Sequence, residues 1–114
     1  MLAVRWNGER QREGSDRVAR EYFEALRRGD STTARGLMCA DADVEHARFE
    51  TVSEFAIERA QDSGSPMDGS GRTYFVRLVL PGGATTDGWL HTEYTSQLKA
   101  CVAFEERRAP TGRS

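Results

Sequence analysis

The sequence predicts an α+β domain in which two to three N-terminal helices pack on a curved antiparallel sheet. Apolar residues first recur at helical spacing, up to about residue 39, and from residue 72 onward they alternate along the chain instead. The turn signal Pro81-Gly82-Gly83 separates two of the alternating runs. Helices followed by strands with short turns are typical of the α+β class, with the helices on one face of the sheet.

A chain of 114 residues is the size of one folded domain. We expect this domain to cover residues 15–106, after a flexible arm at 1–14 and before a flexible tail at 107–114. The 18 acidic and 16 basic residues give a formal charge of −2, so there is no basic excess to neutralise a phosphate backbone. No nucleic-acid partner is therefore expected.

No stretch of the sequence predicts a membrane span. The longest apolar runs, such as 78–80, are far shorter than the roughly 18 residues that a spanning helix needs. Arg5 interrupts the apolar start of the chain, so this start is not the apolar segment of a signal peptide. We expect a cytoplasmic protein, or an extracytoplasmic one if the chain is a fragment of an exported protein.

The first helix is expected between Ser15 and Gly29. Ser15 is a good N-cap, Asp16 suits the positive end of the helix dipole, and Gly29 suits the left-handed residue that ends many helices. One face of this helix is apolar, because the apolar residues recur three and four positions apart. They are Val18, Ala19, Tyr22, Phe23, Ala25 and Leu26.

A second, shorter helix is expected to begin at a cap formed by Asp30 or Ser31 and to end near Cys39. Asp41-Ala42-Asp43 follows as a turn, and residues 43–50 fit either a helical turn or an extended segment. The buried stripe of the second helix consists of Ala34, Leu37 and Met38.

The stretch Val52–Gln61 fits two structures. Phe55 and Ile57 are at strand spacing, whereas Val52, Phe55 and Ala60 also fit one face of a helix. We prefer the strand, followed by a loop over residues 62–71, which are rich in Gly, Ser and Asp.

Three further strands are expected to form an antiparallel meander over Arg72–Leu80, Thr85–Tyr94 and Leu98–Glu105. A turn at Thr95-Ser96-Gln97 joins the last two strands, and the charged residues 105–108 suggest a solvated face. In the last strand the residues expected to share one face are Leu98, Ala100, Val102 and Phe104.

The run from Val18 to Asp30, followed by Leu37-Met38 and Asp41, resembles the opening of nuclear transport factor 2-like domains. This superfamily includes ketosteroid isomerases and SnoaL-like polyketide cyclases. The resemblance covers roughly residues 15–106, since the meander fits the same fold. It implies a cone-shaped domain whose interior binds a small, largely apolar molecule, and a homodimer formed through the exposed face of the sheet.

Two residues are candidates for catalysis. Tyr22 and the tripeptide Val44-Glu45-His46 resemble the places where ketosteroid isomerase-like enzymes have their oxyanion tyrosine and general base, although that base is an aspartate in the isomerases. The resemblance implies that His46 would take a proton while Tyr22 donates a hydrogen bond to the developing enolate. The alternatives are that His46 is a turn histidine and that Tyr22 belongs to the core.

Trp89, His91 and Phe55 are the candidate binding residues. His91 follows Trp89 in the same expected strand, so one pocket could use both. The histidines and the acidic residues near His46 lack the paired spacing that zinc sites favour, so no metal is expected. The sequence has no phosphate-binding or dinucleotide-binding glycine motif, and no cofactor is expected.

The two cysteines, Cys39 and Cys101, are 62 positions apart. We expect them to approach each other, because the second helix must lay its end on the sheet to bury Leu37 and Met38. In an oxidising compartment they could form a disulfide, and in the cytosol they would be buried thiols. Extracytoplasmic actinobacterial members of the resembled superfamily join cysteines at such positions, so this resemblance implies a bond between helix and sheet.

Two functions therefore remain open from the sequence. The first is a small-molecule-binding domain, which could also catalyse proton transfer in the manner of a polyketide cyclase or isomerase. The alternative is a non-catalytic binding or assembly module related to exported actinobacterial domains.

Overall fold

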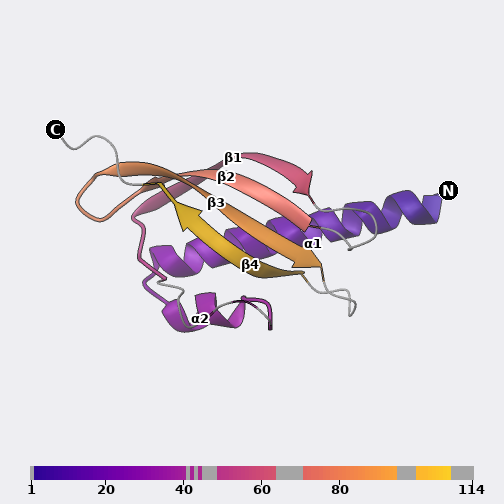
Figure 1. Cartoon of the computed structure of the whole chain (residues 1–114), viewed down its shortest axis with the longest axis horizontal. Helices are drawn as coiled ribbons and strands as arrows, with labels where there is room; N and C mark the ends of the chain where they lie inside the picture. Colours follow the sequence, from indigo (N-terminus) through magenta and orange to yellow (C-terminus); the bar gives the residue numbers. More distant parts are fainter. Residues whose placement is uncertain are drawn as a thin grey trace.

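The computed structural model describes residues 2–40, 42, 44, 49–63, 71–94 and 100–108, and for residues 2–12 and 63 it describes the backbone alone. In this part of the chain, two helices pack on one face of an open four-stranded antiparallel sheet (Figure 1). The long helix α1 (Leu2–Arg27) runs behind the strands, and the short helix α2 (Ser31–Gly36) lies beside its C-terminal end. The predicted α+β class is confirmed.

Helix α1 begins at Leu2, so the expected start at Ser15 is wrong, and residues 2–14 continue the helix instead of forming a separate arm. Ser15 is only 4% exposed inside the helix. Gly14 of this helix lies against β3, and a Cβ added to it would be 3.3 Å from Cε1 of Tyr94. This glycine therefore allows a close approach of helix to sheet and does not end a helix.

The end of α1 and the start of α2 follow the prediction. Gly29 has a φ of +73°, which is the left-handed conformation expected after a helix. Asp30 is the N-cap of α2: its Oδ1 accepts a hydrogen bond from the Thr33 backbone N–H at 3.1 Å. The hydroxyl of Thr33 donates to Oδ2 of Asp30 at 2.6 Å, and these contacts hold the pKa of Asp30 below its usual value.

After α2 the chain runs along the edge of the sheet. Met38 forms a parallel bridge with Val102, whose backbone N–H donates to Leu37 and whose carbonyl accepts from Cys39, both at 2.8 Å. A disulfide joins Cys39 to Cys101, with 4.9 Å between the two Cα atoms. The expected approach of the two cysteines is confirmed. The helical layer is thus bonded covalently to the last strand.

The sheet consists of β1 (Glu54–Ser63), β2 (Gly71–Val79), β3 (Thr85–Tyr94) and β4 (Ala100–Arg107), in that spatial order. The predicted meander is therefore confirmed, as is the preference for a strand over a helix at Val52–Gln61. Glycines 82 and 83 both have a φ of +98° in the turn between β2 and β3. The expected turn at 95–97 lies outside the described residues, as do Asp41, Asp43 and most of the expected loop at 62–71.

The core lies between α1 and the sheet face that α1 covers. Phe55 of β1 stacks on Phe23 of α1, with 5.5 Å between ring centroids. Alternate residues of the central strands point to the same side, as a spacing of two requires. The largest fully buried side chains are Tyr22, Tyr74, Phe23, Leu26, Leu78, Leu90, Val52, Val76, Val102 and Thr92.

A shift of register between β3 and β4 changes which residues of β4 face the helix. His91 pairs with Phe104, whereas the next residue, Thr92, pairs with Val102, so one residue of β4 is left over. Phe104 therefore does not share a face with Val102 as predicted. It lies on the open face, 42% exposed.

Candidate functional site

Tyr22 is a buried link between α1 and β4. Its hydroxyl donates a hydrogen bond to Oε1 of Glu105 at 3.2 Å, and Nε of Arg107 donates to Oε2 of the same carboxylate at 2.6 Å. Arg107 also donates to the carbonyl of Glu50 at 2.7 Å. The side chains of Glu105 and Arg107 are 9% and 14% exposed, so the expectation of a solvated charged face at 105–108 is wrong for these two residues.

The register shift explains this burial, because it places Glu105 opposite Leu90 and Arg107 opposite Gly88, on the helix-covered face. Burial, and then the charge and the hydrogen bond of Glu105, raise the pKa of the Tyr22 phenol far above its usual value. The ring of Tyr22 is also enclosed: the rings of Phe23 and Phe49 lie 5.4 and 6.5 Å away. Its hydroxyl is therefore neutral and already bonded.

His46, the expected general base, lies outside the described residues, and so does its neighbour Glu45. The pairing of His46 with Tyr22 stays a prediction. What the structure does describe around Tyr22 is the polar cluster of Glu105 and Arg107, which the sequence pattern did not single out. Glu105 and Arg107 are two positions apart in a strand and therefore lie on the same face, which is a sequence signal for this cluster.

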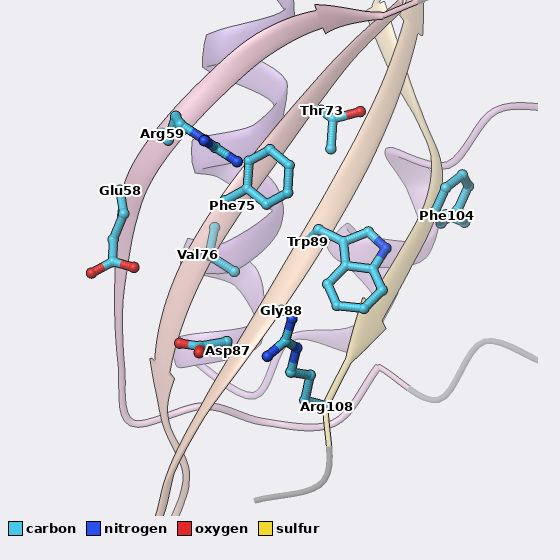
Figure 2. Close-up of a pocket in the computed structure, with 10 residues that line it drawn as sticks. All are labelled: Glu58, Arg59, Thr73, Phe75, Val76, Asp87, Gly88, Trp89, Phe104 and Arg108. Carbon is cyan, nitrogen blue, oxygen red and sulfur yellow. The ribbon is translucent and has the colours of Figure 1, made fainter. Parts of the chain in front are cut away.

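A concave surface of about 670 Å³ lies on the other side of the sheet, the face that α1 does not cover (Figure 2). We call it the open-face groove. It draws residues from all four strands and from the residue that follows β4. They are Glu58, Arg59, Thr73, Phe75, Val76, Asp87, Gly88, Trp89, Phe104 and Arg108.

Aromatic rings give the open-face groove its apolar surface. Phe75 and Trp89 are paired neighbours on β2 and β3. The guanidinium of Arg59 lies over the ring of Phe75, 4.3 Å from its centroid. Figure 2 shows the indole of Trp89 between Phe75 and Phe104.

Two of the three candidate binding residues are at the open-face groove. Trp89 lines it, and His91 adjoins it, because Nδ1 of His91 is 3.1 Å from the Thr73 hydroxyl and its ring stacks on Phe104 at 5.3 Å. The third candidate, Phe55, packs on Phe23 on the opposite side of the sheet. Tyr22 is on that opposite side too, so the structure separates the catalytic candidate from the groove.

The charged side chains of the groove differ in their pairing. Nε of Arg77 is 3.7 Å from Glu58 and 3.6 Å from Asp87, so one arginine neutralises part of both carboxylates. Within the part of the chain that the structure describes, neither Arg59 nor Arg108 has a carboxylate within 4 Å of its guanidinium. Sequence reasoning missed both arginines, because Arg59 is a charged residue within β1 and Arg108 belongs to the charged run 105–108, which suggested a solvated face.

Among the described residues, no three metal-ligating side chains gather into a possible metal site. None of the helices that the structure describes is long and apolar enough to cross a membrane. Comparison of the chain with protein-family models, with curated proteins and with solved structures gives no match.

Proposed function

We propose that this chain is a non-catalytic binding module of the nuclear transport factor 2-like type, and that it holds a small molecule in the open-face groove. The observation that carries the proposal is the groove of about 670 Å³ itself, which lies on the face of the sheet opposite the buried hydrogen bond from Tyr22 to Glu105. The fold assignment is supported by the order of helices and meander and by the resemblance of the Val18–Asp30 run.

The state of Tyr22 argues against the proton-transfer alternative. An oxyanion donor must aim its hydroxyl at the position where negative charge develops on the substrate. The hydroxyl of Tyr22 donates a hydrogen bond to the nearly buried carboxylate of Glu105. If this hydroxyl turned toward a substrate, Oε1 of Glu105 would lose its hydrogen-bond donor. The enclosing rings of Phe23 and Phe49 leave the phenol in a packed environment.

The open-face groove has the properties of a binding site. Its volume of about 670 Å³ lies within the range of about 300–1,000 Å³ that is usual for small-molecule sites. Its surface combines rings with a few charged groups, which is the composition that fixes both affinity and orientation. A homodimer through the same sheet face is the competing use of this surface, because a second copy would cover the groove.

The disulfide supports a place for this module in an oxidising compartment. Disulfides persist mainly in secreted, periplasmic and extracytoplasmic proteins, whereas cytosolic thiols are kept reduced. The bond between Cys39 and Cys101 therefore favours the extracytoplasmic alternative over the cytoplasmic one.

The test uses a neutral apolar fluorescent probe, N-phenyl-1-naphthylamine, with three variants. If the open-face groove is the binding surface, Trp89→Ser and Phe75→Ser should each weaken binding of the probe, and Tyr22→Phe should leave it unchanged. Circular dichroism and thermal unfolding check that each variant is folded. Absence of binding, or loss of binding in Tyr22→Phe alone, contradicts the proposal.

A further inference from the structure

We propose that the open-face groove selects a small organic anion, a molecule with a flat apolar body that carries one or two acidic groups. This inference rests on the proposed function, which makes the groove the binding surface. It adds the charge and shape of the ligand, and it follows from how the arginines of the groove are paired.

The acidic residues of the groove already have a cationic partner in Arg77. Glu58 and Asp87 both lie near the same guanidinium, that of Arg77, at 3.7 and 3.6 Å. Arg77 comes from β2, between the strands that carry the two acids, so it holds a position between them. A cationic ligand would compete with Arg77 for these two carboxylates.

Arg59 and Arg108, in contrast, bring positive charge that no described carboxylate balances. Arg59 lies over Phe75, and stacking on a ring uses the flat face of a guanidinium while its N–H groups still point outward in the plane. An acid bound in this plane can accept two parallel hydrogen bonds. Arg59 is therefore held over Phe75 with N–H groups available to a carboxylate.

Arg108 is positioned through its backbone. Its N–H donates to the carbonyl of Asp87 at 2.9 Å, and its own carbonyl accepts from the hydroxyl of Thr86 at 2.7 Å. These bonds fix the residue that follows β4 beside β3. Figure 2 shows its guanidinium beside Gly88 and Trp89, while that of Arg59 is beside Phe75.

The surface between these two arginines is apolar and suits a flat molecule. Phe75 lies beside Arg59, and its paired neighbour Trp89 lies beside Arg108 (Figure 2). Gly88 contributes backbone to the groove, since a side chain at this position would point to the helix-covered face. Rings prefer offset or edge contacts with other rings, so an aromatic or otherwise planar body gains most from Phe75, Trp89 and Phe104.

The experiment compares matched probes on the full chain carrying Trp6→Phe, in which Trp89 is the remaining indole of the two. The probes are naphthalene-2-carboxylate, the neutral naphthalene-2-carboxamide, the cationic 2-naphthylmethylammonium and naphthalene-2,6-dicarboxylate. Binding is followed by NMR at the indole N–H of Trp89. We expect the carboxylate to bind about fivefold more tightly than the amide, which corresponds to one partly exposed ion pair, and the ammonium to bind most weakly.

Single variants assign the preference to its source. Arg59→Gln and Arg108→Gln should each reduce carboxylate affinity about fivefold and leave amide affinity unchanged. Arg20→Gln is the matched control, since Arg20 is exposed on α1 and lines a different surface depression. Raising the salt concentration should shrink the preference for the carboxylate, because the arginines are exposed.

The outcomes separate the two proposals. If the amide binds as tightly as the carboxylate in the groove, selection of anions is wrong and the binding function stands. If Arg20→Gln weakens carboxylate binding as much as the groove variants do, the preference comes from overall charge and the inference is overturned. If no probe shifts the Trp89 signal, or if the protein is a stable dimer that buries Trp89, both proposals fail.

Discussion

The hydroxyl of Tyr22 in α1 reaches the carboxylate of Glu105 in β4 across 83 positions of sequence, with 3.2 Å between the two oxygens. Arg107 bonds the other oxygen of that carboxylate, so a tyrosine, an acid and a base satisfy one another on the buried side of the sheet. A charged pair in a core costs desolvation, which a close geometry must offset. The contact explains why a polar strand end can lie beneath a helix.

Replacing Tyr22 with Phe tests the strength of this link. Tyr22→Phe removes the hydroxyl and keeps the ring, so Glu105 loses one donor while it retains Arg107. We expect the free energy of unfolding in urea to fall by about 1–2 kcal/mol. An unchanged midpoint of unfolding would show that water replaces the hydroxyl without cost.

The pH dependence of stability should reveal the raised pKa of Tyr22. Burial and Glu105 raise the pKa of Tyr22 in the folded state above the value of about 10 that it has when unfolded. Above this pH the unfolded chain loses the Tyr22 proton and the folded chain keeps it, so stability is full below pH 10 and falls as pH rises further. One such proton corresponds to a slope of about 1.4 kcal/mol per pH unit.

The measurement is urea unfolding between about pH 9 and 11, where unfolded tyrosine titrates. The Tyr22→Phe chain should lose stability less steeply than the unaltered chain over this interval. Tyr74 donates to Asp16 at 2.6 Å and its pKa is raised by burial as well, so Tyr74→Phe should reduce the slope in the same way. Identical slopes in all three proteins would contradict the raised pKa values.

The disulfide should account for a large part of the stability. On the chain-entropy model, a bond that closes a loop of 62 residues stabilises the folded state by about 4 kcal/mol. Reduction by dithiothreitol should therefore lower the midpoint of urea unfolding strongly. The Cys39→Ala/Cys101→Ala variant should match the reduced protein and should not respond to the reductant.

Gly88 should be intolerant of a side chain. A Cβ at this position would be 2.8 Å from the backbone oxygen of Glu106, so β3 and β4 would have to move apart. We expect Gly88→Ala to lower the free energy of unfolding by about 1–3 kcal/mol. Gly36→Ala is the control, because no atom lies within 4 Å of the added Cβ, and its stability should be unchanged or slightly higher.

The sheet was predictable from the sequence because its signals are local. Alternation at a spacing of two, together with Pro81-Gly82-Gly83, defines strands and a turn without reference to the rest of the chain. The caps at Gly29 and Asp30 act through their own backbone neighbours in the same way. These features were all confirmed.

The errors concern residues whose role depends on distant partners. The sequence pattern places Gly14 before the helix, but its small size serves the contact with Tyr94, 80 positions later. Because β4 has one extra residue at the register shift, Phe104 lies on the open face and Glu105 on the helix-covered face. The local sequence pattern does not indicate this extra residue. The open-face groove escaped prediction for the same reason, since its rings and arginines converge only when all four strands are in register.

The bond between Cys39 and Cys101 also decides what a protease can do to this chain. The covalent ring that it closes contains β1, β2, β3 and the connections between them. A single cut at any peptide bond from residue 40 to residue 100 opens the ring and still leaves both fragments attached to each other. The molecule would migrate as one piece on a gel until a reductant is added, and a fragment could leave only after a second cut.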